Sequence, residues 1–235
     1  MGELIEENSL RDKRYVFTDR RDAGRLLSQK LLKFKGSDSM ILAIPSGGVP
    51  IASEIRQTLS LAMDLIIVRK IQIPGNPEAG FGAMSPDEEV ILNERLLNQI
   101  GLTEEEMTTQ IRKTRDVIKK RGHVFREDKP FPSVENKIVF VVDDGLASGY
   151  TMRAAINFIK RKNPLKIIVA VPTASQKTAD SILSEVDELI CLNVRSGYPF
   201  AVADAYEDWY DVTDEEVLEI LKKDNEKIKP GGTAK

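Results

Sequence analysis

Two adjacent carboxylates, Asp143 and Asp144, stand between an apolar segment and a short run of small and hydroxyl-bearing residues. The apolar segment, residues 138–142, predicts a buried strand, and residues 151–162 predict a helix. In open α/β sheets ligands bind beyond the carboxyl ends of the strands, and a helix N-terminus binds phosphate through its backbone N–H groups. Because like charges repel, the two carboxylates suit sugar hydroxyls, or a Mg²⁺ ion held through water. This segment therefore predicts a site for a phosphorylated sugar.

The residue order of this segment resembles the phosphoribosyl pyrophosphate motif of the type I phosphoribosyltransferases. That motif has an apolar strand, two acidic residues, three variable residues, then Ser or Thr, Gly, a small residue and Thr. The resemblance implies that Asp143 and Asp144 bind the ribose 2- and 3-hydroxyls, while the following loop binds the 5-phosphate. The implied phosphoribosyl-binding residues are Asp143, Asp144, Gly145, Leu146, Ala147, Ser148, Gly149, Tyr150 and Thr151.

This segment departs from the family motif at two positions. Tyr150 stands where the family usually has Gly, and Ala147 replaces a frequent Thr. The Tyr150 ring either narrows the phosphate pocket or points away from it. The alternative interpretation of the whole segment is a strand-end turn with an acidic pair and no ligand, which occurs in many doubly wound proteins.

Two further segments stand where the family binds pyrophosphate. Ser46, Gly47 and Gly48 follow the first predicted strand, and Arg69-Lys70 ends the second. Glycines let backbone N–H groups approach a ligand closely. Many relatives carry Arg or Lys in place of Ser46. Pro, Gly and acidic residues over 71–87 predict a long loop, which stands where the family has a mobile lid but contains no Lys or Arg. The alternatives are an ordinary strand-to-helix turn and a solvated basic pair.

Several other pieces resemble one poorly characterised branch of the same family, whose acceptor is not settled. They are residues 17–24, 69–70, 74–78 and 200–203, so that the resemblance covers most of residues 17–217. Phe200 is placed like the aromatic residue that stacks on the base in purine-salvage transferases, which implies a base-binding role. Core packing is an equally good interpretation of Tyr206, Trp209 and Tyr210.

The periodicity along the chain predicts strands alternating with helices, which is typical of a parallel sheet covered on both faces. We expect an α/β fold with about five parallel strands, and a small hood built from the N- and C-terminal segments. One domain is expected over residues 1–224, with a flexible tail over residues 225–235. The predicted strands are 40–44, 65–68, 138–142, 167–171 and 189–194, and the predicted helices are 19–35, 51–59, 103–121, 151–162, 179–184 and 213–223.

The composition argues against several other classes of protein. Lys and Arg total 34 against 37 for Asp and Glu, a net charge of -3, which gives no drive toward nucleic acid or an anionic membrane. Neither a signal peptide nor a membrane span is expected, and the single cysteine, Cys191, is expected to be a buried apolar residue in the reducing cytoplasm. His123 is expected at a helix end without a catalytic role. A homodimer is one oligomeric state that the sequence allows.

The resemblance implies Mg²⁺-dependent transfer of a phosphoribosyl group from phosphoribosyl pyrophosphate to a nitrogen acceptor, expected to be a nucleobase, with release of pyrophosphate. The residues implied in catalysis are Asp143, Asp144, Arg69 and Lys70, with Asp143 and Asp144 contacting the Mg²⁺ ion indirectly. The alternative is a sensor that binds the same ligand, or a nucleotide, without turnover. A hydrolase that holds its metal on Asp143 and Asp144 is a third hypothesis, but no His or Cys cluster supplies further ligands.

Overall fold

A parallel six-stranded sheet forms the centre of the protein in this computed structural model, which describes residues 2–226. All five neighbouring pairs of strands are parallel. In spatial order the strands are β1 (Glu3–Ile5), β9 (Glu188–Arg195), β8 (Lys166–Ser175), β7 (Ile138–Val142), β2 (Ser39–Ala43) and β3 (Ala62–Leu65). The prediction of a parallel α/β sheet is confirmed, with one strand more than expected because the short β1 also pairs with β9.

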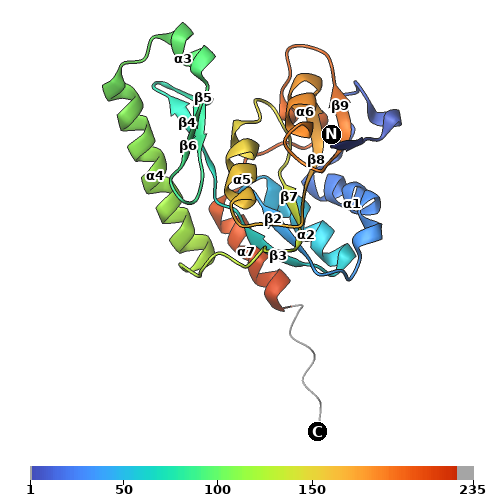
Figure 1. Ribbon diagram of the computed structural model, residues 1–235. Coiled ribbons are helices and arrows are strands. Elements are labelled where there is room, and N and C mark those ends of the chain that lie inside the picture. The colour runs from blue at the N-terminus through green and yellow to red at the C-terminus, as the bar shows by residue number, and fades with distance from the viewer. Residues whose placement is uncertain (1, 227–235) are drawn as a thin grey trace.

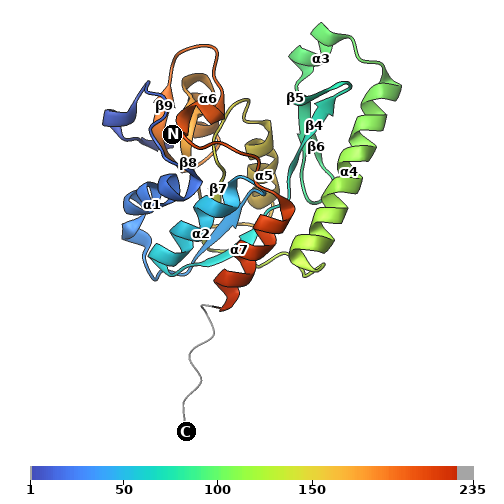
Figure 2. The same ribbon diagram turned by 180° about the vertical axis from the view of Figure 1, so that it is seen from behind.

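Helices cover both faces of this sheet, as the near-continuous apolar runs in its strands require. One face packs against α1 (Arg20–Lys30), α2 (Gly48–Leu59) and α7 (Asp214–Glu226). The other face packs against α5 (Tyr150–Lys160) and α6 (Gln176–Leu183). Figures 1 and 2 show the two layers of helices from opposite sides. Alternate residues of β7 point to opposite faces, so Phe140 lies in the first layer and Val141 in the second.

An antiparallel arm stands beside the sheet, next to α5 (Figures 1 and 2). Its strands are β4 (Arg69–Ile73), β5 (Asn76–Met84) and β6 (Val90–Leu92), followed by α3 (Glu94–Ile100) and α4 (Glu104–Arg126). The N-terminus of α4 carries the predicted capping box, in which Thr103 and Glu106 each accept a hydrogen bond from the other's backbone.

The arm corrects two predictions about local structure. The strand predicted over residues 65–68 ends at Leu65 as β3, and Arg69-Lys70 begins the antiparallel strand β4 instead of ending a parallel one. Residues 71–87, predicted as a loop, form most of a hairpin. Their glycines suggested a loop, but Gly82 serves close strand packing, since a Cβ there would lie 2.3 Å from the carbonyl oxygen of Ile91.

The N-terminal segment meets the C-terminal part of the chain at Phe17 and Tyr206. Phe17 forms a parallel bridge with Tyr206, and their ring centroids are 5.6 Å apart. Helix α7 extends to Glu226, a few residues beyond its predicted end, so two residues of the expected tail are helical. The rest of that tail lies outside the described residues. Among residues 2–226, no helix has the length and apolar character that crossing a membrane requires.

Candidate functional site

The acidic pair lies at the carboxyl end of β7, in the middle of the parallel sheet. Both carboxyl groups are in a poorly solvated position, and burial is the largest cause that raises the pKa of each. The charge of Asp144 raises the pKa of Asp143 further, while the guanidinium of Arg20 opposes the rise at Asp144. The Asp143 side chain also accepts a hydrogen bond from the backbone N–H of Asp144, at 2.9 Å.

Arg20, the first residue of α1, forms an ion pair with Asp144. Its Nε and Nη2 lie 3.0 and 2.9 Å from Oδ2 of Asp144, and its side chain is only 5% exposed. The guanidinium carbon lies 3.9 Å from the centroid of the Trp209 ring, and Nη1 donates a hydrogen bond to the carbonyl of Tyr210 at 2.7 Å. Sequence reasoning missed Arg20, because 124 positions separate it from its partner.

The C-terminal aromatic residues divide between the core and the acidic pair. Tyr206 is buried against Phe17, and its hydroxyl donates a 2.7 Å hydrogen bond to the backbone carbonyl of Asp144. Its ring lies 5.3 Å from that of Trp209. Tyr206 therefore packs in the core and also fixes the backbone of the acidic pair.

The glycine loop that precedes α2 lies directly against the acidic pair. A Cβ on Gly47 would lie 1.9 Å from Oδ2 of Asp144, and one on Gly48 would lie 2.5 Å from the carbonyl oxygen of Val142. Only residues without a side chain permit this approach. The two segments are almost 100 positions apart in sequence, and parallel pairing of β2 with β7 brings them together.

Positive charge gathers beside Ser46 from the antiparallel arm. Arg121 of α4 places its Nη2 3.4 Å from the Ser46 hydroxyl and 2.9 Å from Oδ1 of Asp214. Burial and the nearby charge of Arg121 lower the pKa of Arg69, and Asp214 opposes that shift. Sequence reasoning missed Arg121, which brings a cation near the position where Ser46 itself carries none.

Arg69 and Lys70 are the first two residues of β4, and their side chains have different surroundings. Consecutive residues of a strand point to opposite faces. Arg69 lies in the electrostatic neighbourhood of Arg121 and Asp214. The stem of Lys70 instead runs across β5, so that a Cβ on Gly80 would lie 2.2 Å from Cγ of Lys70.

The loop between β7 and α5 divides into buried and accessible residues. Leu146 is buried and bridges Ala174, whereas Ala147 and Ser148 are exposed. Gly149 adopts a φ of +80° directly before α5, and none of the described side chains caps that helix. The N-terminal N–H groups of α5 are therefore available to an anion, beside the Ser148 hydroxyl.

A cavity of about 660 Å³ opens beside this loop. Ala147, Ser148 and Tyr150 line it together with Phe200, which follows β9. Arg95 of α3 lines it from the arm, so the cavity lies between the arm and the sheet. The structure thus brings Phe200 to the same cavity as the predicted phosphate loop.

The described residues contain no cluster of three or more His, Cys, Asp or Glu suited to a metal ion. Two adjacent carboxylates are nevertheless compatible with Mg²⁺, which commonly takes one or two carboxylates and completes its shell with water and substrate phosphates. His123 is exposed in the last turn of α4, where its Nδ1 lies 2.7 Å from Oδ2 of Asp128. Cys191 is fully buried, and burial raises the pKa of its thiol.

The sheet order and the two layers of helices define a doubly wound α/β protein. Residues 19–205 match the family model of the phosphoribosyl transferase domain. A Mycobacterium tuberculosis (strain H37Rv) protein named "Putative phosphoribosyl transferase Rv0571c" is 32% identical over 208 residues, which cover 88% of this chain and 47% of that protein. The chain belongs to the phosphoribosyl transferase domain family, and it spans about half the length of the curated relatives it matches.

Solved structures also resemble this chain. The crystal structure of TT1426 from Thermus thermophilus is 33% identical, with a TM-score of 0.69, over 88% of this chain and 98% of that one. A hypoxanthine phosphoribosyltransferase from Staphylococcus aureus has 13% identity and a TM-score of 0.47, over 87% of this chain and 94% of that one.

Proposed function

We propose that this chain transfers the 5-phosphoribosyl group of phosphoribosyl pyrophosphate to a nitrogen acceptor, with Mg²⁺ and with release of pyrophosphate. One observation carries the proposal: the acidic pair, the close-packed glycine loop and the uncapped N-terminus of α5 meet at the carboxyl edge of one parallel sheet. The carboxylates suit the ribose hydroxyls, the glycine loop suits the pyrophosphate, and the helix N-terminus suits the 5-phosphate.

The substrate would lie across these segments in one orientation. Asp143 and Asp144 accept hydrogen bonds from the ribose 2- and 3-hydroxyls, and residues 147–151 bind the 5-phosphate. The loop at Ser46, Gly47 and Gly48 binds the pyrophosphate through its backbone. Phe200 stacks on the acceptor ring, for which the shared cavity gives support. Base–aromatic stacking contributes about 1–3 kcal/mol where nucleic-acid bases bind proteins.

In the reaction the bond between C1 and the pyrophosphate oxygen breaks, and its electron pair leaves with the pyrophosphate. The acceptor nitrogen forms the new bond to C1 with its lone pair. An acceptor nitrogen that carries a proton loses it to solvent, whereas a pyridine nitrogen has none to lose and becomes positively charged. Mg²⁺, when bound, neutralises charge on the pyrophosphate. Arg69 and Arg121 bring guanidinium groups to the side of the Ser46 loop, where Asp214 offsets part of their charge. Catalysis then rests on positioning and on charge neutralisation of the leaving group.

Lys70, expected beside Arg69, has no clear route to the same pyrophosphate because its stem crosses β5. We therefore assign the leaving group to Arg69 and Arg121. Two features favoured a sensor without turnover: the uncharged Ser46 and the absence of Lys and Arg from residues 71–87. The guanidinium of Arg121 near Ser46 argues against the first of these.

The test is pyrophosphate release from phosphoribosyl pyrophosphate and Mg²⁺, with purine, pyrimidine and pyridine acceptors offered one at a time. We expect acceptor-dependent release, strongly reduced in Asp144→Asn because charge-assisted hydrogen bonds to the ribose contribute about 1.5–3 kcal/mol each. Asp116→Asn, an exposed carboxyl on α4, is the matched control and should retain activity. Binding of phosphoribosyl pyrophosphate without release for any acceptor would favour the sensor instead.

A further inference from the structure

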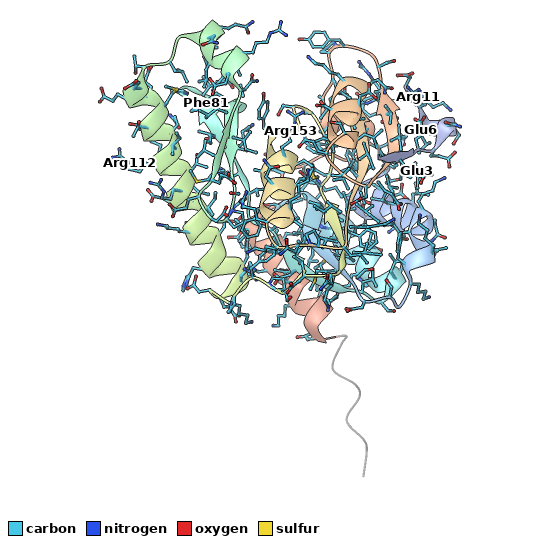
Figure 3. The ribbon with its side chains drawn as sticks, in the orientation of Figure 1. Glu3, Glu6, Arg11, Phe81, Arg112 and Arg153 are labelled. Atoms are coloured by element: carbon cyan, nitrogen blue, oxygen red, sulfur yellow. The ribbon has the colours of Figure 1, made fainter. Side chains whose placement is uncertain are left out.

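The side chains that line the cavity beside the phosphate loop carry positive charge. Among the described residues that line it, four are Arg or Lys and none is Asp or Glu. Arg153 is offset by Glu185, whose carboxylate lies 2.7 Å from its Nε. Arg153, labelled on α5 in Figure 3, also donates a hydrogen bond to the Ser181 hydroxyl of α6. The other three cations, Arg95, Lys177 and Arg195, come from α3, α6 and the end of β9.

Arg195 is the most informative of these cations. Its side chain is about 95% buried, and its Nε is buried without a hydrogen-bond partner. Asp204, which also lies 3.8 Å from Arg14, is 3.7 Å from Arg195, beyond direct hydrogen-bonding distance. Its Nη2 donates a hydrogen bond to the carbonyl of Ala201, so Nε is the donor of this buried guanidinium that lacks a partner, and burial lowers the pKa of Arg195. An anion bound in the cavity would compensate the charge of this guanidinium.

Aromatic rings line the same cavity as these cations. The Arg195 guanidinium lies 4.4 Å from the centroid of the Phe200 ring. Tyr150 and Tyr198 also belong to the lining, and Tyr198 is 96% exposed. Rings of this kind favour a flat ligand, since planar groups stack on aromatic faces.

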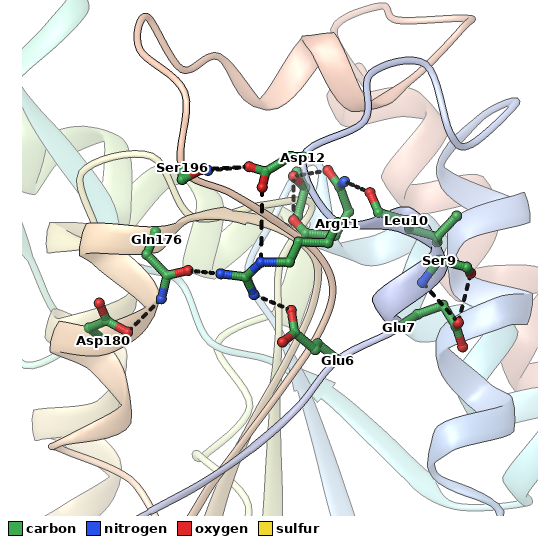
Figure 4. A network of polar contacts seen from close by, with 11 residues as sticks. Glu6, Glu7, Ser9, Leu10, Arg11, Asp12, Gln176, Asp180 and Ser196 are labelled. Carbon is green, nitrogen blue, oxygen red and sulfur yellow. Dashed lines mark hydrogen bonds and ion pairs between the residues drawn. The ribbon is translucent and has the colours of Figure 1, made fainter.

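The N-terminal segment forms hydrogen bonds with two residues that line the cavity, Gln176 and Ser196. Arg11 donates a hydrogen bond to Gln176 at the start of α6 and pairs with Glu6 at 2.6 Å. Asp12 accepts hydrogen bonds from the backbone and the hydroxyl of Ser196, at 2.6 and 2.8 Å. Figure 4 shows this network, which ties together two elements that line the cavity. A braced site loses less conformational entropy on binding.

From this lining we infer that the acceptor is an anionic planar heterocycle, such as a ring carboxylate. Its charge would lie among Arg95, Lys177 and Arg195, with its ring against Phe200. This inference rests on the proposed transfer reaction and names its acceptor class. The 5-phosphate at the start of α5 is bound largely by backbone N–H groups, which leaves the cations on α3, α6 and β9 for the acceptor. The anionic group is not consumed: a ring nitrogen bonds to C1 while pyrophosphate leaves.

The test compares product nucleotides that differ in ring charge, since they occupy the phosphate loop and the acceptor position together. Calorimetry would measure orotidine 5-monophosphate against uridine 5-monophosphate, and nicotinate mononucleotide against nicotinamide mononucleotide. We expect the ring carboxylate to bind at least tenfold more tightly in one pair. Lys177→Gln and Arg95→Gln should each lower that preference by about tenfold, as for the loss of one charge-assisted hydrogen bond.

The controls are Lys113→Gln and Arg112→Gln, two exposed cations on α4, which should leave the preference unchanged. Figure 3 shows Arg112 on the outer side of α4, away from the sheet. Equal or weaker binding of both ring carboxylates, or no effect of the cavity variants, would overturn the inference. If phosphoribosyl pyrophosphate still binds and is turned over in that case, the proposed function stands. If phosphoribosyl pyrophosphate neither binds nor reacts, the proposed function is wrong, and the inference about its acceptor is wrong with it.

Discussion

Replacing Arg20 by Gln removes the guanidinium that contacts Asp144 at 2.9 and 3.0 Å. Removing one partner of a buried ion pair costs about 3–5 kcal/mol, because the other charge stays buried without compensation. Asp144 is 18% exposed, so the low end, about 3 kcal/mol, applies. For a chain of this size, each kcal/mol lowers the melting temperature by about 2–4 °C. We therefore expect a decrease of about 6–12 °C by scanning calorimetry.

The same substitution should change how ligand binding depends on pH. Burial raises the pKa of Asp144, and Arg20 opposes this rise, so its removal raises that pKa further. The ionised carboxylate accepts the ribose hydroxyls, and binding is therefore lost as the pH falls through the folded-state pKa. The midpoint of that loss should lie at a higher pH in Arg20→Gln than in the wild type. Arg20→Lys keeps the positive charge, so its pH midpoint for ligand binding should lie between those of the wild type and Arg20→Gln.

The matched control is Arg21→Gln, on the next residue of α1. Arg21 is 42% exposed and lies 3.3 Å from Glu54, a surface pair that contributes about 0–1 kcal/mol. A melting temperature of Arg20→Gln no lower than that of the control, together with an unchanged pH midpoint, would refute the role assigned to Arg20.

Three further predictions test separate parts of the site. Gly47→Ala should abolish phosphoribosyl pyrophosphate binding, measured by calorimetry, because the new Cβ would lie 1.9 Å from Asp144. The control is Gly122→Ala, where a Cβ meets nothing within 4 Å, and this variant should bind normally. Arg121→Gln should lower kcat more than it raises KM in the pyrophosphate-release assay, since the transition state carries more charge on the leaving group, and equal effects on both would contradict this. Cys191 should react with a thiol reagent only after denaturant is added, because its thiol is fully buried with a raised pKa, and rapid labelling of the folded protein would show otherwise.

The sequence predicted the elements whose signals are local. Residues 138–142 match β7 at both ends, and the capping box at Thr103 and Glu106 marks the start of α4. Both signals depend only on neighbouring residues, through apolar periodicity in one case and cap chemistry in the other. The parallel fold follows because such strands alternate with helices.

Long-range contacts were not predictable from the same patterns. Arg20 looks like any helix-starting Arg until the fold brings it to Asp144, 124 positions away. Arg121 lies in a long charged helix where a solvated position is the usual expectation, and only the packing of α4 on the arm brings it to Ser46. The arm was missed because glycines that permit close strand packing give the same local signal as glycines in a loop.

The most direct test of the site is a crystal structure with a nucleoside 5-monophosphate bound. We expect density with the phosphate at the N-terminus of α5, beside Ser148, and the ribose hydroxyls on Asp143 and Asp144. The base should lie in the adjacent cavity against Phe200. A nucleotide bound elsewhere, or one whose ribose hydroxyls face away from both carboxylates, would contradict the assignment of this edge of the sheet as the phosphoribosyl site.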